Sequence, residues 1–168
     1  VPFGGAGAMH SCELAEEMHI PQILIPPHPG ILSALGVAIA DVVKDYSKTV
    51  MLRGDDLEKG RLDKEFSVLE DQANEDMSRE GIRLDLLSTE RYLDIRYIGQ
   101  SYELTIDYPS STKNFVRTIT SVFHKSHKRR FGYSDSDFLI EIVNLSVKVI
   151  LPMEKPYVTP EPVSYTHL

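Results

Sequence analysis

The chain has 168 residues, of which 42% are hydrophobic and 26% charged, and its formal net charge is −7. This length gives about one domain with a core, and the composition excludes a disordered chain. The negative charge argues against nucleic acid or an anionic membrane as the principal partner. The longest apolar stretch, residues 31–43, is interrupted by Gly36 and Asp41 and is too short to span a membrane. The lone Cys12 excludes an internal disulfide, so we expect a reducing, cytoplasmic location, with Cys12 as a small core residue.

A glycine-rich turn near the start of the chain leads into a predicted helix over about residues 6–18. Small residues let a ligand approach the main chain, and amides at the start of a helix favour phosphate. The turn matches neither common glycine-rich phosphate motif, so a tight turn that needs small residues for packing is the alternative. His10 is a candidate substrate- or metal-facing imidazole or, alternatively, a polar group on the helix surface. The candidate ligand contacts in the turn are Gly4, Gly5, Ala6 and Gly7.

The segments that follow alternate between extended and helical patterns. Residues 22–25 form a short apolar run that predicts a buried strand. Prolines make residues 26–30 a stiff loop, in which His28 is either a candidate active-site residue or part of a structural loop. Residues 31–40 are apolar almost all round, which predicts a helix buried on most sides. This alternation is typical of an α/β fold.

The middle of the chain contains its clearest helical pattern. Residues 42–52 lose helical spacing and predict a strand, followed by a turn at residues 53–56. Apolar residues then recur at intervals of three and four, so we expect an amphipathic helix that ends at Gly81. Its expected core positions are Leu62, Phe66, Leu69, Ala73 and Met77.

Two alternating segments predict a β-hairpin. In residues 91–97, Leu93, Ile95 and Tyr97 share one face, and residues 102–107 alternate again. The Gly99-Gln100 pair between them places glycine at the first central position of the expected type II′ turn.

A second amphipathic helix and a last strand complete the predicted elements. Ser111 or Thr112 is the expected N-cap, and the helix is expected to end before Gly132. His124 and His127 lie beside several cations, so we interpret them as part of a solvated basic face rather than a metal site. Apolar positions of this helix are Phe115, Ile119, Val122 and Phe123, and those of the strand over residues 140–151 are Val143, Leu145, Val147 and Val149. The second part is thus predicted to be α+β with a mostly antiparallel sheet.

Several segments resemble the hydantoinase A/5-oxoprolinase family. The segments are Phe3-Gly4-Gly5-Ala6-Gly7-Ala8-Met9-His10, residues 25–36, residues 96–104, and shorter runs at residues 131–133 and 141–145. The similarity extends from residue 1 to about residue 150. Ala8 stands where the family often has proline, a mild change in the first turn of a helix.

The resemblance implies an ATP-dependent enzyme that opens a cyclic amide, such as 5-oxoproline or a hydantoin, by phosphorylating its carbonyl. It implies that residues 1–52 are the end of an actin/sugar-kinase/Hsp70-like ATPase lobe, followed by an α+β region over residues 53–152. We expect an irregular tail over residues 153–168, of which residues 163–168 resemble translated sequencing-adapter read-through. The glycine turn would then contact the nucleotide, and His10 and His28 would be site candidates.

The resemblance also implies ATP with a Mg-type divalent metal, whose ligands we expect outside this chain, and a hydantoinase B-type subunit or domain as partner. Without the family's first phosphate loop and metal-binding carboxylates, we expect this C-terminal fragment alone not to hydrolyse ATP. Two alternatives remain open: a subunit of an ATP-dependent acetone-type carboxylase, and a non-catalytic module that docks a partner subunit.

Overall fold

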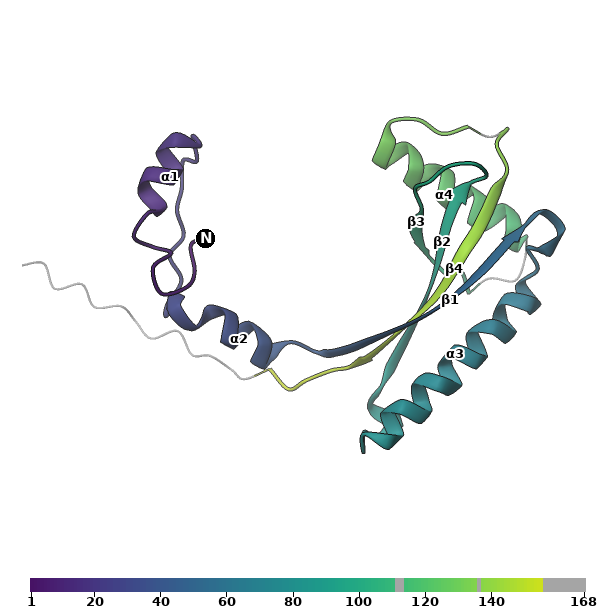
Figure 1. Cartoon of the computed structure of the whole chain (residues 1–168), viewed down its shortest axis with the longest axis horizontal. Helices are drawn as coiled ribbons and strands as arrows, with labels where there is room; N and C mark the ends of the chain where they lie inside the picture. The colour runs from purple at the N-terminus through teal and green to yellow at the C-terminus, as the bar shows by residue number, and fades with distance from the viewer. Residues whose placement is uncertain (111–113, 136, 156–168) are drawn as a thin grey trace, which may run out of the picture. The chain divides into compact units, whose positions relative to one another are not determined.

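The computed structural model describes residues 1–110, 114–135 and 137–155 and divides the chain into two compact units. Unit 1 contains Val1–Asp41 and the chain after Leu151, and unit 2 is Val42–Leu151 (Figure 1). None of the helices in the described part of the chain has the length and apolar character of a membrane span. The sequence-based division at residues 52 and 152 differs from this one chiefly in the first strand, which belongs to the sheet of unit 2.

Unit 2 consists of a four-stranded antiparallel sheet and two long helices (Figure 1). The strand order is β1-β4-β2-β3, so β4 lies between β1 and β2, and every ladder is antiparallel. The first and last residues of the unit, Val42 and Leu151, are register partners at one end of the β1–β4 ladder. The elements are β1 Val42–Arg53, α3 Lys59–Arg79, β2 Ser88–Tyr97, β3 Leu104–Asp107, α4 Phe115–Phe131 and β4 Ile140–Leu151.

A single hydrophobic core holds both helices against one face of the sheet. All five predicted core positions of α3 are buried, which confirms the helix and the face that it buries. Leu93, Ile95 and Tyr97 of β2 are also buried, as their alternation predicts. The two 3-10 turns that flank α3 are η2 Gly54–Asp56 and η3 Leu84–Leu86.

A β-bulge in β4 changes which of its residues face the helices. Asp94 of β2 pairs with Asn144, but the next residue of β2 pairs with Ile142, so Val143 is an extra residue in β4. The bulge shifts the alternation by one position, and Ile142 joins Leu145 in the core. Val143 is buried, as predicted, at 7% exposed, but the bulge takes it out of the main core cluster, in which the simple alternation would place it.

The β2–β3 turn also differs from its prediction. The amide of Gln100 donates to the Tyr97 carbonyl oxygen over 3.0 Å, so Ile98 and Gly99 are the central residues. Gly99 has φ +89° at the second central position, which is the pattern of a type II turn rather than type II′. The one-residue offset arises because Ile98 is held by a bond from its own amide to the Leu139 carbonyl oxygen.

Helix α4 begins and ends in left-handed backbone. Its N-cap residue is Asn114, with φ 53°, whereas the predicted caps Ser111 and Thr112 lie outside the described residues. Gly132 ends the helix with φ 84°, and its amide donates to the Lys128 carbonyl oxygen, which confirms the predicted end.

Unit 1 contains two short helices, α1 Ser11–Glu17 and α2 Leu32–Ile39, with the 3-10 turn η1 Pro29–Ile31 before the second. The predicted start of the first helix at residue 6 is wrong. Residues 4–10 form successive tight turns closed by i→i+3 bonds, because glycines favour turns over helix.

Two further predictions for unit 1 are wrong. Residues 22–25 form no strand: the strands in the described residues all belong to unit 2, and residues 22–25 pair with none of them. The apolar helix α2 has no buried residue, and Val37 is 79% exposed, since the described part of unit 1 supplies no second layer to cover it. Cys12 is exposed rather than a core residue.

Candidate functional site

The glycine turn lies against the proline loop. Gly4, with φ +87°, donates its amide hydrogen to the Pro29 carbonyl oxygen over 2.8 Å. A Cβ built on Gly30 would lie 4.0 Å from the Gly5 Cα, so the two segments pass close to each other. The structure therefore brings together two of the sequence segments on which the family resemblance is based.

The glycines of this turn have different roles. A Cβ on Gly7 would lie 2.1 Å from the Phe3 carbonyl oxygen, so Gly7 is required for the turn to close. Gly5 and Ala6 are exposed, and nothing lies within 4 Å of a Cβ on Gly5. Among the described residues, the amides of Gly5 and Ala6 donate no hydrogen bond, whereas the Gly4 and Gly7 amides bond within the unit. Two adjacent open amides on a tight turn can donate hydrogen bonds to an anionic oxygen.

The two histidine candidates are exposed and lie in turns. His10 is the N-cap residue of α1 without a side-chain cap bond, and its carbonyl oxygen accepts the Leu14 amide hydrogen. His28 has a left-handed backbone, φ 54° and ψ 55°, between two prolines, an unusual conformation for a residue other than glycine. Neither imidazole bonds another described side chain, so the structure leaves both available but gives neither a partner.

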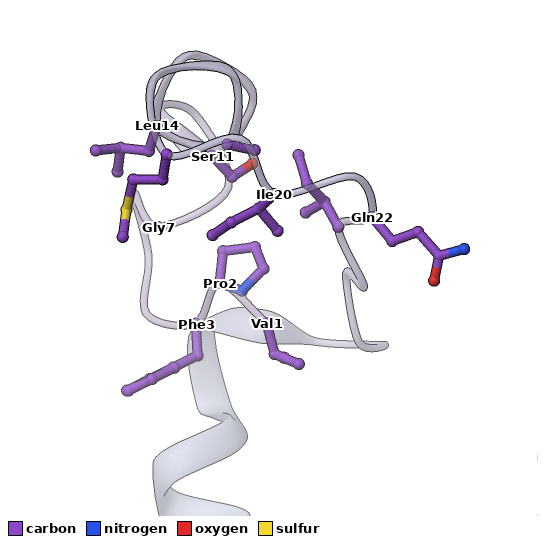
Figure 2. A pocket seen from close by; sticks show the side chains of 11 residues that line it. Val1, Pro2, Phe3, Gly7, Ser11, Leu14, Ile20 and Gln22 are labelled. Atoms are coloured by element: carbon purple, nitrogen blue, oxygen red, sulfur yellow. The ribbon is translucent and has the colours of Figure 1, made fainter.

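A mostly apolar pocket of about 390 Å³ lies beside the glycine turn, and Figure 2 shows the side chains that line it. The Ser11 hydroxyl is already bonded to the Ala8 carbonyl oxygen, and no charged side chain lines the pocket. The pocket therefore suits an apolar group rather than a phosphate. This pocket was not predicted from the sequence, although Leu14 and Met18 lie four residues apart, a spacing that places two apolar side chains on one face of a helix. The lining residues with large side chains are Phe3, Leu14, Met18, Ile20 and Ile23.

No group of three or more His, Cys, Asp or Glu residues in the described ranges could hold a metal ion. The expectation that metal ligands lie elsewhere stays a prediction.

A charged network connects α3 to the sheet of unit 2. Arg91 donates to both carboxylate oxygens of Glu70, over 2.6 and 2.7 Å, and Tyr108 donates to Asp63 over 2.8 Å. Burial and the bond to Asp63 raise the pKa of Tyr108 above its usual range. Burial would raise the pKa of Asp63 too, but hydrogen bonds from Lys59 and Tyr108 outweigh it and lower that pKa. Because these groups satisfy one another, the network stabilises the fold rather than forming an open site.

His127 of α4 does not lie on a solvated face as predicted, whereas His124 is partly exposed and lines a surface hollow with Lys125 and Lys128. His127 is 2% exposed, and its Nδ1 donates to the Tyr133 carbonyl oxygen over 2.8 Å. The His124 Nε2 is enclosed without a hydrogen-bond partner in the described residues. The interpretation failed for His127 because its neighbouring cation at i+1 lies on a different side of the helix.

The first 46 residues match the model of the Hydantoinase/oxoprolinase family. An uncharacterized protein of Methanocaldococcus jannaschii is 36% identical in sequence to this chain, and the match covers 97% of this chain and 24% of that protein. A 5-oxoprolinase of Dictyostelium discoideum is 29% identical over 86% of this chain and 11% of its own length.

Two solved structures share the fold. The ATP-dependent caprolactamase of Pseudomonas jessenii superimposes with a TM-score of 0.74 at 28% identity, over 97% of this chain and 25% of that one. Nucleotide-free acetone carboxylase superimposes with a TM-score of 0.83 at 22% identity, over 97% of this chain and 25% of the carboxylase chain. The similarity to acetone carboxylase concerns the fold alone. The chain spans about a quarter or less of the length of these relatives, and it belongs to the hydantoinase/oxoprolinase family.

Proposed function

We propose that this chain is the C-terminal part of an ATP-dependent enzyme that opens cyclic amides, with 5-oxoproline or a hydantoin as substrate. The family match over residues 1–46 and the similarity to a 5-oxoprolinase and to an ATP-dependent caprolactamase support it. All three names denote hydrolysis of a ring amide. Within this proposal, residues 1–52 complete an actin/sugar-kinase/Hsp70-like ATPase lobe.

The nucleotide contact is assigned to the glycine turn. The observation that carries this assignment is the pair of open amides at Gly5 and Ala6. Gly4 and Gly7 would act indirectly, because one anchors the turn to Pro29 and the other lets it close. The assignment does not use the dipole of α1, which starts only at Ser11. His10 and His28 are the substrate-site candidates, on the ground of their exposure near the turn and the loop.

ATP with a Mg-type ion would supply a phosphoryl group that activates the amide carbonyl, and the ion's ligands would come from outside the described residues. A hydantoinase B-type subunit or domain is the proposed partner, and a cytoplasmic location is proposed from the lone cysteine. The chain by itself is proposed to be inactive in ATP hydrolysis, because phosphoryl transfer needs a metal ion and charge-stabilising groups.

Two other functions compete with this proposal. An acetone-type carboxylase is supported by structural similarity at 22% identity, which extends only to the fold. Cyclic-amide hydrolysis is favoured because the similarity to the caprolactamase is seen in the sequence as well, at 28% identity. In a docking module, the glycine turn would serve packing alone, as Gly7 does.

The test is the substitution Gly5→Asp in the full-length protein, with Gly5→Ala as the uncharged control. The open space around Gly5 accepts either side chain, but a carboxylate next to the two amides repels phosphate. ATP affinity should fall by about tenfold or more in Gly5→Asp and by less than about twofold in Gly5→Ala. Equal ATP affinities in the two variants would contradict the nucleotide contact and indicate that the turn serves packing alone.

The same protein is assayed for ATP-dependent opening of 5-oxoproline, hydantoin and caprolactam, and for carboxylation of acetone with bicarbonate. Turnover of a cyclic amide supports the proposal, whereas carboxylation alone replaces it with the carboxylase.

A further inference from the structure

The exposed side of α4 carries a hollow of about 430 Å³, and its lining residues have polar or charged side chains whose carbon atoms form most of the wall. Its α4 residues recur every three or four positions and so form one stripe next to the buried face. The other wall is Ser134, in the loop after the helix. The lining residues are Arg117, Thr120, Ser121, His124, Lys125, Lys128 and Ser134.

The positive charge of this hollow is not neutralised within the described residues. Helix α4 has five Lys and Arg residues and no Asp or Glu, in a chain of net charge −7. Arg117, Lys125 and Lys128 form no ion pair with any described carboxylate. By contrast, most cations of α3 and the sheet are paired, among them Lys44, Lys48, Lys59, Arg91 and Arg96. Like charges gathered without a counter-charge favour a bound anion.

The loop wall is held in place by two bonds to buried groups. On one side of Ser134, the Tyr133 carbonyl oxygen accepts the Nδ1 hydrogen of buried His127. On the other side, the Asp135 amide donates to the hydroxyl of Tyr97, 3.0 Å away. The Asp135 carboxylate accepts the amide hydrogen of Asp137, within its own loop. Ser134 therefore faces the helix from a fixed position.

The polar groups of the hollow include donors without partners. Thr120 already donates its hydroxyl to the Val116 carbonyl oxygen, but Ser121 and Ser134 donate to no described residue. His124 also lines the hollow, but its Nε2 is buried and its ring packs edge-on against Tyr97, so we do not count it among the donors of the hollow.

We propose that this hollow binds a small phosphate-bearing anion, with Arg117, Lys125 and Lys128 supplying charge and the two serines supplying hydrogen bonds. Its volume suits a small ligand. A concave site with hydroxyl donors favours a compact anion over an acidic protein surface, which would also engage Arg129 and Arg130 outside the hollow. The proposal is independent of the nucleotide contact assigned to the glycine turn.

The test is calorimetric titration of the protein with inorganic pyrophosphate. The substitution pair Lys125→Gln and Lys128→Gln removes two charges from the hollow. The pair Arg129→Gln and Arg130→Gln removes two charges from the same helix outside it, and is the matched control. We expect affinity to fall by about tenfold or more in the first variant and by less than about twofold in the second. All four side chains are exposed, so both variants should fold, which circular dichroism checks.

Two results would overturn the proposal. One is an equal loss of affinity in both variants, which indicates a diffuse positive field. The other is absence of pyrophosphate binding at millimolar concentration. A poly-glutamate peptide is titrated in parallel, and its binding without pyrophosphate binding would assign the face to an acidic protein partner instead.

Discussion

The amide of Gly4 donates a hydrogen bond to the carbonyl oxygen of Pro29, 2.8 Å away, and thereby joins the glycine turn to the proline loop. Both partners are main-chain atoms, so the contact depends on backbone conformation rather than on side-chain identity. Gly4 makes this contact with a left-handed backbone, φ +87°, and His28, the residue before Pro29, also has a left-handed backbone, φ 54°. The geometry of the two loops is therefore determined by a few backbone positions, which substitutions can test.

Gly7→Ala should disrupt the turn, because the new Cβ would lie 2.1 Å from a backbone oxygen that no rotamer change can move. Gly5→Ala, with open space around it, is the matched control. Hydrogen exchange of residues 3–10 should become faster in Gly7→Ala and stay unchanged in Gly5→Ala. Equal protection in the two variants would contradict the predicted close contact.

Asp63→Asn should weaken unit 2 in a pH-dependent way. The pKa of Asp63 is lowered from 3.8 in the folded chain, so its ionised form contributes stability above about pH 4. This contribution is lost as the pH falls through the lowered pKa. Since the side chain is 41% exposed, screening limits the effect to about 0.5–1 kcal/mol at pH 7.

Urea unfolding at several pH values measures the Asp63 effect, and the difference from the unsubstituted chain should disappear at the acid end. Asp71→Asn, at an exposed position of the same helix, is the control and should show no such dependence. A constant difference at all pH values would count against the charge pairing.

Leu69→Ala should lower the free energy of unfolding by about 2–5 kcal/mol, because Leu69 is 5% exposed and belongs to the shared core. Its neighbour Val68 is 57% exposed, so Val68→Ala should change stability by about 0.5 kcal/mol or less. Chemical denaturation measures both. Similar values for the two substitutions would contradict the orientation of α3.

Gly99→Ala should cost about 1 kcal/mol, because φ +89° is unfavourable for alanine even though nothing crowds its Cβ. Gly60, inside α3, has only an ordinary contact with Glu58, so Gly60→Ala should instead stabilise the chain by about 0.5 kcal/mol. Thermal unfolding compares the two, and shifts of the same sign would contradict the assigned turn.

The elements of unit 2 were predictable because long periodic patterns determine which face is buried. The recurrence from Leu62 to Met77 predicted a helix and its core face, and the alternation of Leu93 to Tyr97 predicted a strand. Both patterns are local, and the burial that they require is supplied by the other elements of the same unit.

The failures concern features that depend on distant contacts. The extra residue Val143 is recognised only from the register of β4 with its neighbours. His127 looked exposed in a basic sequence but is enclosed by Tyr97 and by the loop that follows α4. For residues 22–25, an apolar run alone could not show whether a partner strand lies beside it. The nucleotide assignment of the glycine turn comes from the family resemblance, and its open amides at Gly5 and Ala6 could be found only from the structure.

Because Val42 pairs with Leu151, the chain enters unit 2 and leaves it at neighbouring positions of the sheet. Such a segment is modular in the evolutionary sense: recombination could transplant residues 42–151 between proteins with a single pair of adjacent junctions. A gene segment for residues 42–151 would encode both strands of the β1–β4 ladder, in which the first and last residues of the unit pair.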